Sequence, residues 1–401
     1  MAIELKTSTQ KTSQISRNYQ KLNGHRKTLQ NLIDGSGITI NGNNPWDMKV
    51  HNPNTYKRIL SNCSLGLGES YMEGWWEAES LDQFFEKLYL AKLNQKAKNP
   101  GFLWQVLKSK LFNMQSISRS KQVTKQHYDV GNNLYEKMLG PTMQYTCAYW
   151  QEENKDNLEQ AQKEKMDLVC RKLQLKPGEK ILELGSGFGN FAKFMAENYG
   201  VSVTAYNISK EQIKYAREHN NHPNVTFIER DYRSAEEDFK EEYFEKFVSV
   251  GLREHIGPKN YKNFVRILHK LTKSDGLGLV HSISKKKVSK TLDPWTKKYI
   301  FPNGHIPGDQ QIKKSYENRF EILDWHDLIN HYNPTLEEWH KRFETAWPEL
   351  EPEYEHQVNG QFKNMWDYYI SSCTGAFKAG ALKVTQEVLS KEKISEYKII
   401  R

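Results

Sequence analysis

Apolar runs alternate with amphipathic segments between residues 180 and 283. The runs have the length and the apolar content of buried strands, and they are ILEL (181–184), VSVTAY (201–206), VTFIE (225–229), KFVSVG (246–251) and GLGLVHSI (276–283). The segments between them have a helical period, and in the first of them Phe191, Phe194, Met195 and Tyr199 share one face before Gly200. This alternation predicts an α/β fold with a doubly wound, mostly parallel sheet that binds ligands at the carboxyl ends of its strands.

The flanking segments have a different pattern. Residues 1–20 are polar, and we expect a flexible N-terminus. Residues 21–100 indicate a small α+β domain, with short strand-like runs in GITINGNNPWDMKVHN (37–52) and a helix from Ser80, the expected N-cap, to about residue 93. Residues 101–122 are expected to be a basic linker, and residues 123–401 form the α/β domain. Near the C-terminus, two helical stripes are apolar: Leu336, Trp339, Phe343 and Trp347, and then Met365, Trp366, Tyr369, Ile370, Cys373 and Phe377.

Composition narrows the class of protein. The 401 residues carry 58 Lys and Arg against 49 Asp and Glu, a net charge of +9, and 12% are aromatic. No apolar run is long enough to span a membrane, and MAIELKTSTQKTSQ at the N-terminus has no apolar region that would direct export. The four cysteines form no CxxC pair, so neither a disulfide framework nor a structural zinc site is expected. We therefore expect a cytoplasmic protein without a metal.

The positive charge is concentrated in one segment. Between Lys87 and Tyr128 there are nine Lys or Arg and no Asp or Glu, interleaved with Trp, Phe and Leu side chains. An anionic membrane surface attracts this combination, although a solvated linker or a nucleic-acid contact has the same composition. A second basic cluster consists of Lys285, Lys286, Lys287 and Lys290.

A glycine-rich loop follows the first strand of the alternating region. Gly185, Gly187 and Gly189, with Ser186 among them, lie between a strand and a helix, the context that favours an S-adenosylmethionine site over a simple tight turn. The second strand ends without the acidic residue that often binds ribose hydroxyls, so Asn207 and Gln212 are expected as neutral partners. After the third strand, Asp231 and Tyr232 are candidates for contacting the adenine.

Several motifs together resemble the cyclopropane-fatty-acyl-phospholipid synthases, and the resemblance covers nearly the whole chain. They are NPWDMKVHNP (44–53), SLGLGESYMEGWW (64–76), HYDVGNNLYEKML (127–139), MQYTCAYW (143–150), ELGSGFGNFAKFMAENYGVSV (183–203), VSVGLREHIGPKNY (248–261), DPWTKKYIFPNGHIP (293–307) and CTGAFK (373–378). The resemblance implies a Rossmann-like class I methyltransferase fold. It also implies methyl transfer from S-adenosylmethionine to a cis double bond of a membrane phospholipid, and a homodimer at the inner membrane surface.

The resemblance also implies site residues. A bicarbonate ion would act as the base inside a cage made by Cys147, Glu254, His281, Ile283 and Tyr332. The cofactor would be bound by the glycine-rich loop, Asp231 and Tyr232, together with Tyr145, Thr146, Asn207, Ile208, Ser209 and Gln212. Cys373 matches a family motif once given a catalytic role, but its place in the C-terminal apolar stripe favours packing.

The chemistry of such a reaction requires a dry, aromatic site with one base. An isolated alkene is a weak nucleophile, so the sulfonium must be held in line with it, and the resulting cation must be shielded from water. Arg253, next to Glu254, departs from the family pattern and is expected to face outward. Two alternatives stay open at this stage: an N-methyltransferase of small amines, and a non-catalytic lipid-binding or RNA-binding protein on the same fold.

Overall fold

The computed structural model describes residues 23–92, 131–286, 292–394 and 396–401. These residues form two compact units. The N-terminal unit consists of the described residues up to 92 together with 293–295 and 351–379, and the sheet unit contains the other described residues. The expected flexible N-terminus (1–20), the basic linker (101–122) and Lys287 and Lys290 of the second basic cluster lie outside the described residues. In the described part of the chain, no helix has the length and apolarity needed to cross a membrane.

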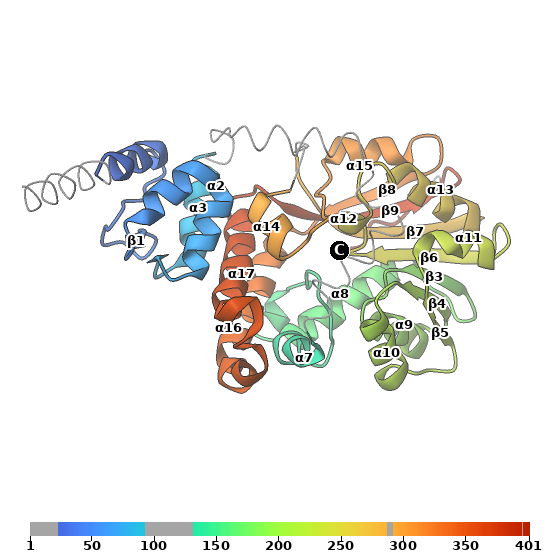
Figure 1. Ribbon diagram of the computed structural model, residues 1–401. Helices are drawn as coiled ribbons and strands as arrows, with labels where there is room; N and C mark the ends of the chain where they lie inside the picture. Colours follow the sequence, from blue (N-terminus) through green and yellow to red (C-terminus); the bar gives the residue numbers. More distant parts are fainter. Residues whose placement is uncertain (1–22, 93–130, 287–291, 395) are drawn as a thin grey trace, which may run out of the picture. The chain divides into compact units, whose positions relative to one another are not determined.

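A seven-stranded sheet forms the centre of the sheet unit, in the order β5-β4-β3-β6-β7-β9-β8 (Figure 1). The first five of these strands are parallel to one another. Strand β9 is antiparallel to both of its neighbours, β7 and β8. The strands are β3 (Lys180–Leu184), β4 (Ser202–Asn207), β5 (Val225–Glu229), β6 (Phe244–Val250), β7 (Thr272–Ser284), β8 (Glu321–Asp327) and β9 (Lys383–Ser390). The expected doubly wound, mostly parallel sheet is confirmed, because the chain moves outward from β3 to β5 and then returns to the other side of β3.

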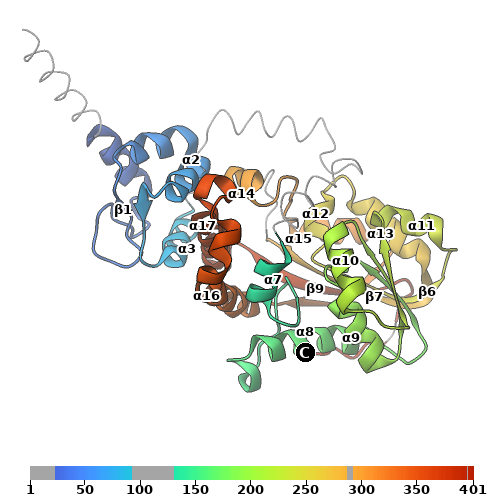
Figure 2. The ribbon, with the colours of Figure 1, turned by 60° about the horizontal axis from the view of Figure 1, so that its bottom comes forward.

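Helices cover both faces of this sheet (Figure 1, and in the turned view of Figure 2). One core packs α8 (Leu158–Lys172), α9 (Asn190–Tyr199) and α10 (Lys210–His219) against Ile181, Val203 and Leu279. The other core packs α11 (Ala235–Asp238), α13 (Tyr261–Leu271) and α15 (Asp309–Tyr316) against Leu182 and Val280. Neighbouring strand residues thus belong to opposite cores, as the alternation of side chains along a strand requires. The remaining helices of this unit are α7 (Asn132–Leu139), α12 (Arg253–Ile256), the larger part of α14 (Pro294–Tyr299) and most of α16 (Ile329–Tyr354), with short 3₁₀ turns at Glu152–Asn154 and Tyr232–Ser234.

The N-terminal unit is built mainly from three helices: α2 (Asn54–Met72), α3 (Leu81–Leu90) and α17 (Phe362–Lys378). A two-stranded antiparallel sheet, β1 (Lys49–Val50) with β2 (Trp76–Glu77), accompanies them. Helix α17 packs closely on α3, because a methyl group added at Gly375 would lie 2.5 Å from the Cβ atom of Phe85. Lys378 on α17 also forms an ion pair of 2.8 Å with Asp82. Residues 351–379, which the sequence assigns to the α/β domain, therefore pack with the N-terminal unit.

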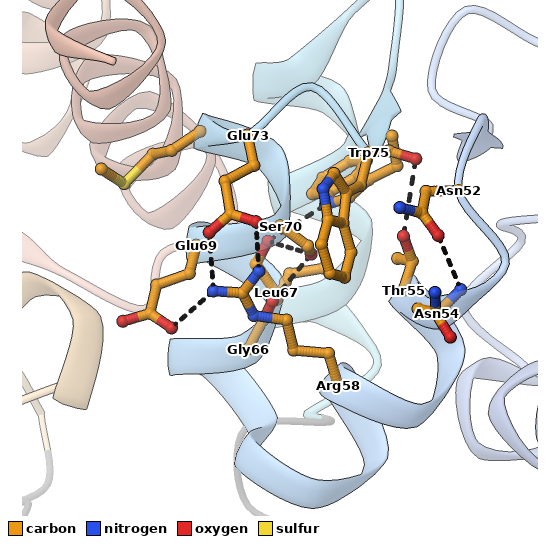
Figure 3. Close-up of polar contacts among 12 residues, drawn as sticks. Asn52, Asn54, Thr55, Arg58, Gly66, Leu67, Glu69, Ser70, Glu73 and Trp75 are labelled. Carbon is orange, nitrogen blue, oxygen red and sulfur yellow. Dashed lines mark hydrogen bonds and ion pairs between the residues drawn. The ribbon is translucent and has the colours of Figure 1, made fainter. Parts of the chain in front are cut away.

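Helix α2 is broken at Cys63, which has φ 49° and ψ −128°. Across this break, Arg58 forms ion pairs with Glu69 at 3.0 Å and with Glu73 at 2.7 Å, and its guanidinium lies 4.8 Å from the ring centre of Trp75 (Figure 3). These contacts hold the two halves of α2 together. The sequence did not predict α2, and the strand-like runs expected in residues 37–52 shrink to β1 and an isolated bridge between Ile40 and Met48.

Candidate active site

The glycine-rich loop connects the end of β3 to the start of α9. Gly185, Gly187 and Gly189 all have positive φ angles, of 88°, 55° and 84°, so the loop needs residues without a Cβ atom. Amide groups of Gly185 and Ser186 donate to the carbonyl of Tyr206 over 2.9 and 3.1 Å, which ties the loop to the end of β4. A Cβ atom at Gly189 would lie 2.7 Å from Phe227, whereas one at Gly187 would meet nothing within 4 Å. The loop therefore packs tightly against the core at Gly189, whereas there is free space beside Gly187.

Two buried polar atoms beside this loop lack partners among the described residues. They are Oγ of Ser186 and Oε2 of Glu183, which lies on β3 two residues before Gly185. Burial raises the pKa of Glu183 to about 8, and the charge of Lys165 opposes the shift. Unpaired buried groups are costly, so they favour a polar ligand at this place. The residues present thus fit the S-adenosylmethionine expected here.

The residues after β4 form a small network of neutral hydrogen bonds. Nδ2 of Asn207 donates to the carbonyl of Gly187 at 3.0 Å and to Oε1 of Gln212 at 2.9 Å. Oγ of Ser209 caps α10 by accepting from the amide of Gln212. Ile208 lies between them and is half-buried. Asn207 therefore ties the loop after β4 to the glycine-rich loop, and Ser209 and Gln212 support it without any acidic side chain.

The residues after β5 already have partners within the described part of the chain. Both carboxylate oxygens of Asp231 accept from Arg233, at 2.7 Å each. The ring of Tyr232 is buried in the core, with its centroid 5.6 Å from that of Phe264. Their contact with adenine stays a prediction, and the Asp231 carboxylate would have to share its oxygens with Arg233.

Glu254 makes the central contact of the expected anion cage. Its side chain is 92% buried, and Oε1 accepts from the backbone N–H of Ile283 at 2.6 Å. Oε2 is buried without a partner among the described residues. Burial raises the pKa of Glu254 to about 7, while the hydrogen bond from Ile283 lowers it. A buried carboxyl with one satisfied and one unsatisfied oxygen is suited to binding a small polar group that carries a proton.

His281 lies on β7, two residues before Ile283, and is almost fully buried. Its carbonyl accepts from the amide of Gly251 at 2.9 Å, and Nδ1 lies 3.3 Å from Nε2 of Gln386 on β9. Burial holds the pKa of His281 well below its usual value, and the positive charge of Lys165 lowers it further. The imidazole is therefore neutral near pH 7 and can offer one N–H and one lone pair.

Cys147 and Tyr332 are brought together through their neighbours. Sγ of Cys147 lies 3.9 Å from the carbonyl of Leu328, the residue before α16, and Tyr332 is in the first turn of that helix. Trp150, three residues beyond Cys147, donates its backbone N–H to His331 at 3.0 Å. Burial raises the pKa of the Cys147 thiol far above neutral pH, so the group is an uncharged thiol there.

An aromatic cluster links the expected cofactor and anion residues. The ring of Trp339 on α16 lies 5.2 Å from that of Tyr145 and 6.0 Å from that of Tyr332, centre to centre. Thr146, next to Tyr145, has its methyl group 3.0 Å from the position of a Cβ atom on Gly251, at the end of β6. Tyr145, Thr146, Cys147 and Tyr332 therefore gather on the side of the sheet unit that also carries Gly251.

Cys373 is not part of this group. It lies on α17 in the N-terminal unit and is half-buried, with buried Met365, Trp366, Ile370 and Phe377 on the same stripe. Burial raises the pKa of its thiol to about 12, which makes a thiolate rare at neutral pH. A catalytic role for Cys373 stays a prediction without support from its surroundings.

The outward orientation expected for Arg253 is wrong. Arg253 is 98% buried and pairs with Glu387 on β9 at 2.8 Å, while one of its amino groups donates to Oγ of Ser282 at 3.1 Å. Arg253 forms no ion pair with Glu254, although its charge lowers the pKa of that carboxyl. The buried partner Glu387 lies in a strand that the sequence patterns did not predict.

Sequence reasoning also missed two buried residues on α8. Gln162 donates to the carbonyl of Thr146 at 2.9 Å, and Lys165 donates to Oγ1 of Thr146 at 2.9 Å. The sequence pattern of α8 does not indicate that Gln162 and Lys165 are buried, because a polar residue at a buried position looks the same in sequence as an exposed one. A polar pair three residues apart on an otherwise apolar face would have been the available hint.

Comparison with known proteins agrees with this geometry. The doubly wound sheet, the glycine-rich loop after β3 and the similarity to solved cyclopropane synthases show that the chain is an S-adenosylmethionine-dependent methyltransferase. Residues 115–387 match the family described as mycolic acid cyclopropane synthetase, and the chain belongs to this family of cyclopropane synthases.

Individual relatives support the same assignment. The cyclopropane-fatty-acyl-phospholipid synthase of Escherichia coli is 45% identical over 361 residues, which are 90% of this chain and 92% of that protein. A probable fatty acid methyltransferase of Pseudomonas putida is 33% identical and covers 65% of this chain and 66% of its own length. Among solved structures, the cyclopropane synthase MmaA2 from Mycobacterium tuberculosis superposes with a TM-score of 0.60 at 25% identity, over 67% of this chain and 98% of its own.

Proposed function

We propose that the protein transfers a methyl group from S-adenosylmethionine to a cis double bond in the acyl chain of a membrane phospholipid and closes a cyclopropane ring. The observation that carries this proposal is the 45% identity to the cyclopropane-fatty-acyl-phospholipid synthase of Escherichia coli. Because that alignment covers 90% of the chain, it includes part of the N-terminal unit and not only the methyltransferase fold. Coclaurine N-methyltransferase, with a TM-score of 0.67 at 20% identity, shares the fold alone and lends no support to an amine substrate.

The reaction has simple requirements. A bond forms between the methyl carbon and one alkene carbon as the sulfur–methyl bond breaks, leaving a cation. Loss of a proton from the added methyl group then supplies the electron pair that closes the ring. The bound bicarbonate would accept this proton. The chain must therefore hold an anion, keep water away and place aromatic faces beside the cation.

The described residues offer groups for each requirement. We assign the anion to the place between Cys147, Glu254, His281, Ile283 and Tyr332, where Oε2 of Glu254 lacks a partner among the described residues. This oxygen is suited to accept the O–H of a bicarbonate, and the neutral imidazole of His281 is suited to donate to it. Trp339, Tyr145 and Tyr332 supply π faces in the same region.

The test is direct. The purified protein is incubated with vesicles of unsaturated phospholipid and methyl-labelled S-adenosylmethionine, and the fatty acids are analysed by mass spectrometry. We expect each product chain to gain one CH₂ and to lose its double bond. Methylation of an added amine, with no change in the fatty acids, would contradict the proposal.

We further propose that the protein works as a homodimer on the surface of an anionic membrane. The basic segment from Lys87 to Tyr128, with nine Lys or Arg and no acid, supports the membrane contact, since each basic residue near anionic headgroups contributes about 1 kcal/mol. Pelleting with anionic vesicles should therefore weaken steeply with salt, and neutral vesicles should bind little. Sedimentation velocity gives the state of association.

A further inference from the structure

A lysine is buried behind the segment that carries Cys147. Lys165 lies on α8 with 1% of its surface exposed, and its ammonium donates to Oε1 of Gln144 at 2.7 Å and to Oγ1 of Thr146 at 2.9 Å. Both acceptors are neutral. Within the described parts of the chain, no carboxylate lies within ion-pair distance of it, in contrast to Lys172 on the same helix, which pairs with Asp324 at 3.2 Å. A buried cation without a counter-ion is unfavourable, so its retention calls for a reason.

The titratable groups around Lys165 belong to three elements. Glu183 is on β3, Cys147 is in the segment before α8, and His281 is on β7. Burial lowers the pKa of Lys165 to about 7, and Cys147 and Glu183 raise it. In turn, the charge of Lys165 lowers the pKa of both Cys147 and His281. Its electric field therefore reaches two of the five residues assigned above to the anion.

An anion bound between the five assigned residues would need a positive charge nearby to balance it. Glu254 is neutral or negative near pH 7, His281 is neutral, and Cys147 is a thiol, so none of the three offers a positive charge. Arg253 is the neighbour of Glu254, but its guanidinium is already matched by the carboxylate of Glu387. Lys165 is a cation whose charge is not yet balanced by an ion pair.

We propose that Lys165 is a positioning residue of the anion site: it anchors the segment 144–147 through Gln144 and Thr146, and its unbalanced positive charge favours the binding of bicarbonate beside Cys147 and His281. This inference rests on the proposed function, because it assumes an anion there. Since bound anion and protonated lysine stabilise each other, bicarbonate should bind more weakly as the pH rises and Lys165 loses its proton.

The experiment measures turnover in buffers depleted of carbon dioxide, with bicarbonate added back at fixed pH. The variants are Lys165→Met, which removes the charge and the donors, and Lys165→Arg, which keeps both. Lys172→Met is the matched control: this second buried lysine of α8 also lowers the pKa of His281, but its charge is balanced by the ion pair with Asp324 at 3.2 Å.

We expect Lys165→Met to raise the half-saturating bicarbonate concentration by about tenfold or more, with a change of no more than about threefold in the KM for S-adenosylmethionine. Lys165→Arg should recover most of the affinity. Lys172→Met should lower stability but leave the bicarbonate dependence as it is. Equal bicarbonate dependence in wild type and Lys165→Met overturns the inference.

The experiment distinguishes a failure of the inference on Lys165 from a failure of the proposed function. A wild-type enzyme that makes the cyclopropane product at the same rate with and without bicarbonate contradicts the anion part of the proposed function itself. If Lys165→Met does not fold, the comparison of wild type with Lys165→Arg decides. Between pH 7 and 9, the half-saturating bicarbonate concentration should rise more steeply in the wild type than in the arginine variant, where Glu254 still loses its proton but the arginine keeps its own. Parallel pH profiles overturn the inference.

Discussion

The guanidinium of Arg253 and the carboxylate of Glu387 form an ion pair of 2.8 Å from which solvent is almost fully excluded. The pair connects α12, which carries Glu254, with β9, and the hydroxyl of Tyr316 donates to the same carboxylate at 3.0 Å. One residue further along α12, Glu254 is held by the amide of Ile283 on β7. Two adjacent residues of α12 are thus tied to two strands, Arg253 to β9 and Glu254 to β7.

Removing one partner of this pair should be far worse than removing both. Arg253→Met leaves the Glu387 carboxylate buried beside hydroxyl groups alone, and we expect a loss of about 3–5 kcal/mol in the free energy of unfolding. Glu387→Met should cost a similar amount, while the double variant should recover a large part of it. Urea unfolding of the four proteins gives the coupling energy, and additive losses would show that the pair is not coupled.

Glu254→Gln should separate activity from stability. We expect turnover to fall by at least about 100-fold, with S-adenosylmethionine affinity changed only slightly. The pKa of Glu254 is raised to about 7 in the folded protein, so the folded state holds a proton that the unfolded state releases between about pH 4.5 and 7. Wild-type stability therefore falls as the pH rises through this window.

The Glu254→Gln variant should not lose stability in this way, because its side chain does not titrate. Relative to wild type, its free energy of unfolding should improve by about 3 kcal/mol between pH 4.5 and pH 8. Chemical denaturation at both pH values measures the difference, and Glu254→Asp, which still titrates, is the control. An identical pH dependence in wild type and Gln variant would mean that Glu254 is ionised at its ordinary pKa.

Gly187 and Gly189 should respond differently to the addition of one methyl group. At Gly189 a Cβ atom would lie 2.7 Å from both Ala216 and Phe227, so Gly189→Ala should lower stability by several kcal/mol. At Gly187 nothing lies within 4 Å, and only the left-handed backbone costs about 1 kcal/mol. If the open side binds the cofactor, Gly187→Ala should raise its Kd by about tenfold, as calorimetry would measure. Unchanged affinity would place the cofactor elsewhere.

Cys373→Ser should retain most of the activity. The thiol belongs to the N-terminal unit, whereas the residues assigned to the anion belong to the sheet unit, and its pKa of about 12 leaves little thiolate at neutral pH. Turnover within about threefold of wild type is expected, with a modest loss of thermal stability from the helix stripe. A loss of turnover beyond 100-fold in a folded variant would restore Cys373 to the mechanism.

Cys63 holds a backbone conformation that favours glycine. Its φ of 49° and ψ of −128° break α2, and a side chain there is strained. Cys63→Gly should therefore raise the free energy of unfolding by about 1 kcal/mol, whereas Cys63→Ala, which keeps a Cβ atom, should not. Denaturant titration of both variants checks this, and a less stable glycine variant would contradict the strain.

The parallel half of the sheet could be predicted because its strands are short apolar runs. β3 to β7 all lie where the sequence pattern places them, and Gly200 ends α9 with the left-handed geometry expected of it. The apolar stripe of α16 is also confirmed at Leu336, Trp339 and Phe343, which are buried. Local periodicity is sufficient for such elements.

The antiparallel edge could not be predicted, because its strands bury polar side chains. β9 carries Thr385, Gln386 and Glu387, all fully buried, in a pattern that looks solvent-exposed. Their partners, among them Arg253 and His281, are more than 100 residues away in sequence. The position of Arg253 was misjudged for this reason, and Lys165 was missed because burial of a charge is decided by contacts that no local pattern contains.

The place of β9 between β7 and β8 has a consequence for how the protein is made. During synthesis on the ribosome, β3 to β7 emerge first, and β7 then presents an unpaired edge until residues 383–390 follow. Over that interval Arg253 and His281 lack the acceptor and the amide that Glu387 and Gln386 supply. The sheet unit therefore cannot finish folding before residues 383–390 are synthesised. If the ribosome stalls shortly before that point, the exposed edge of β7 makes the nascent chain prone to aggregate.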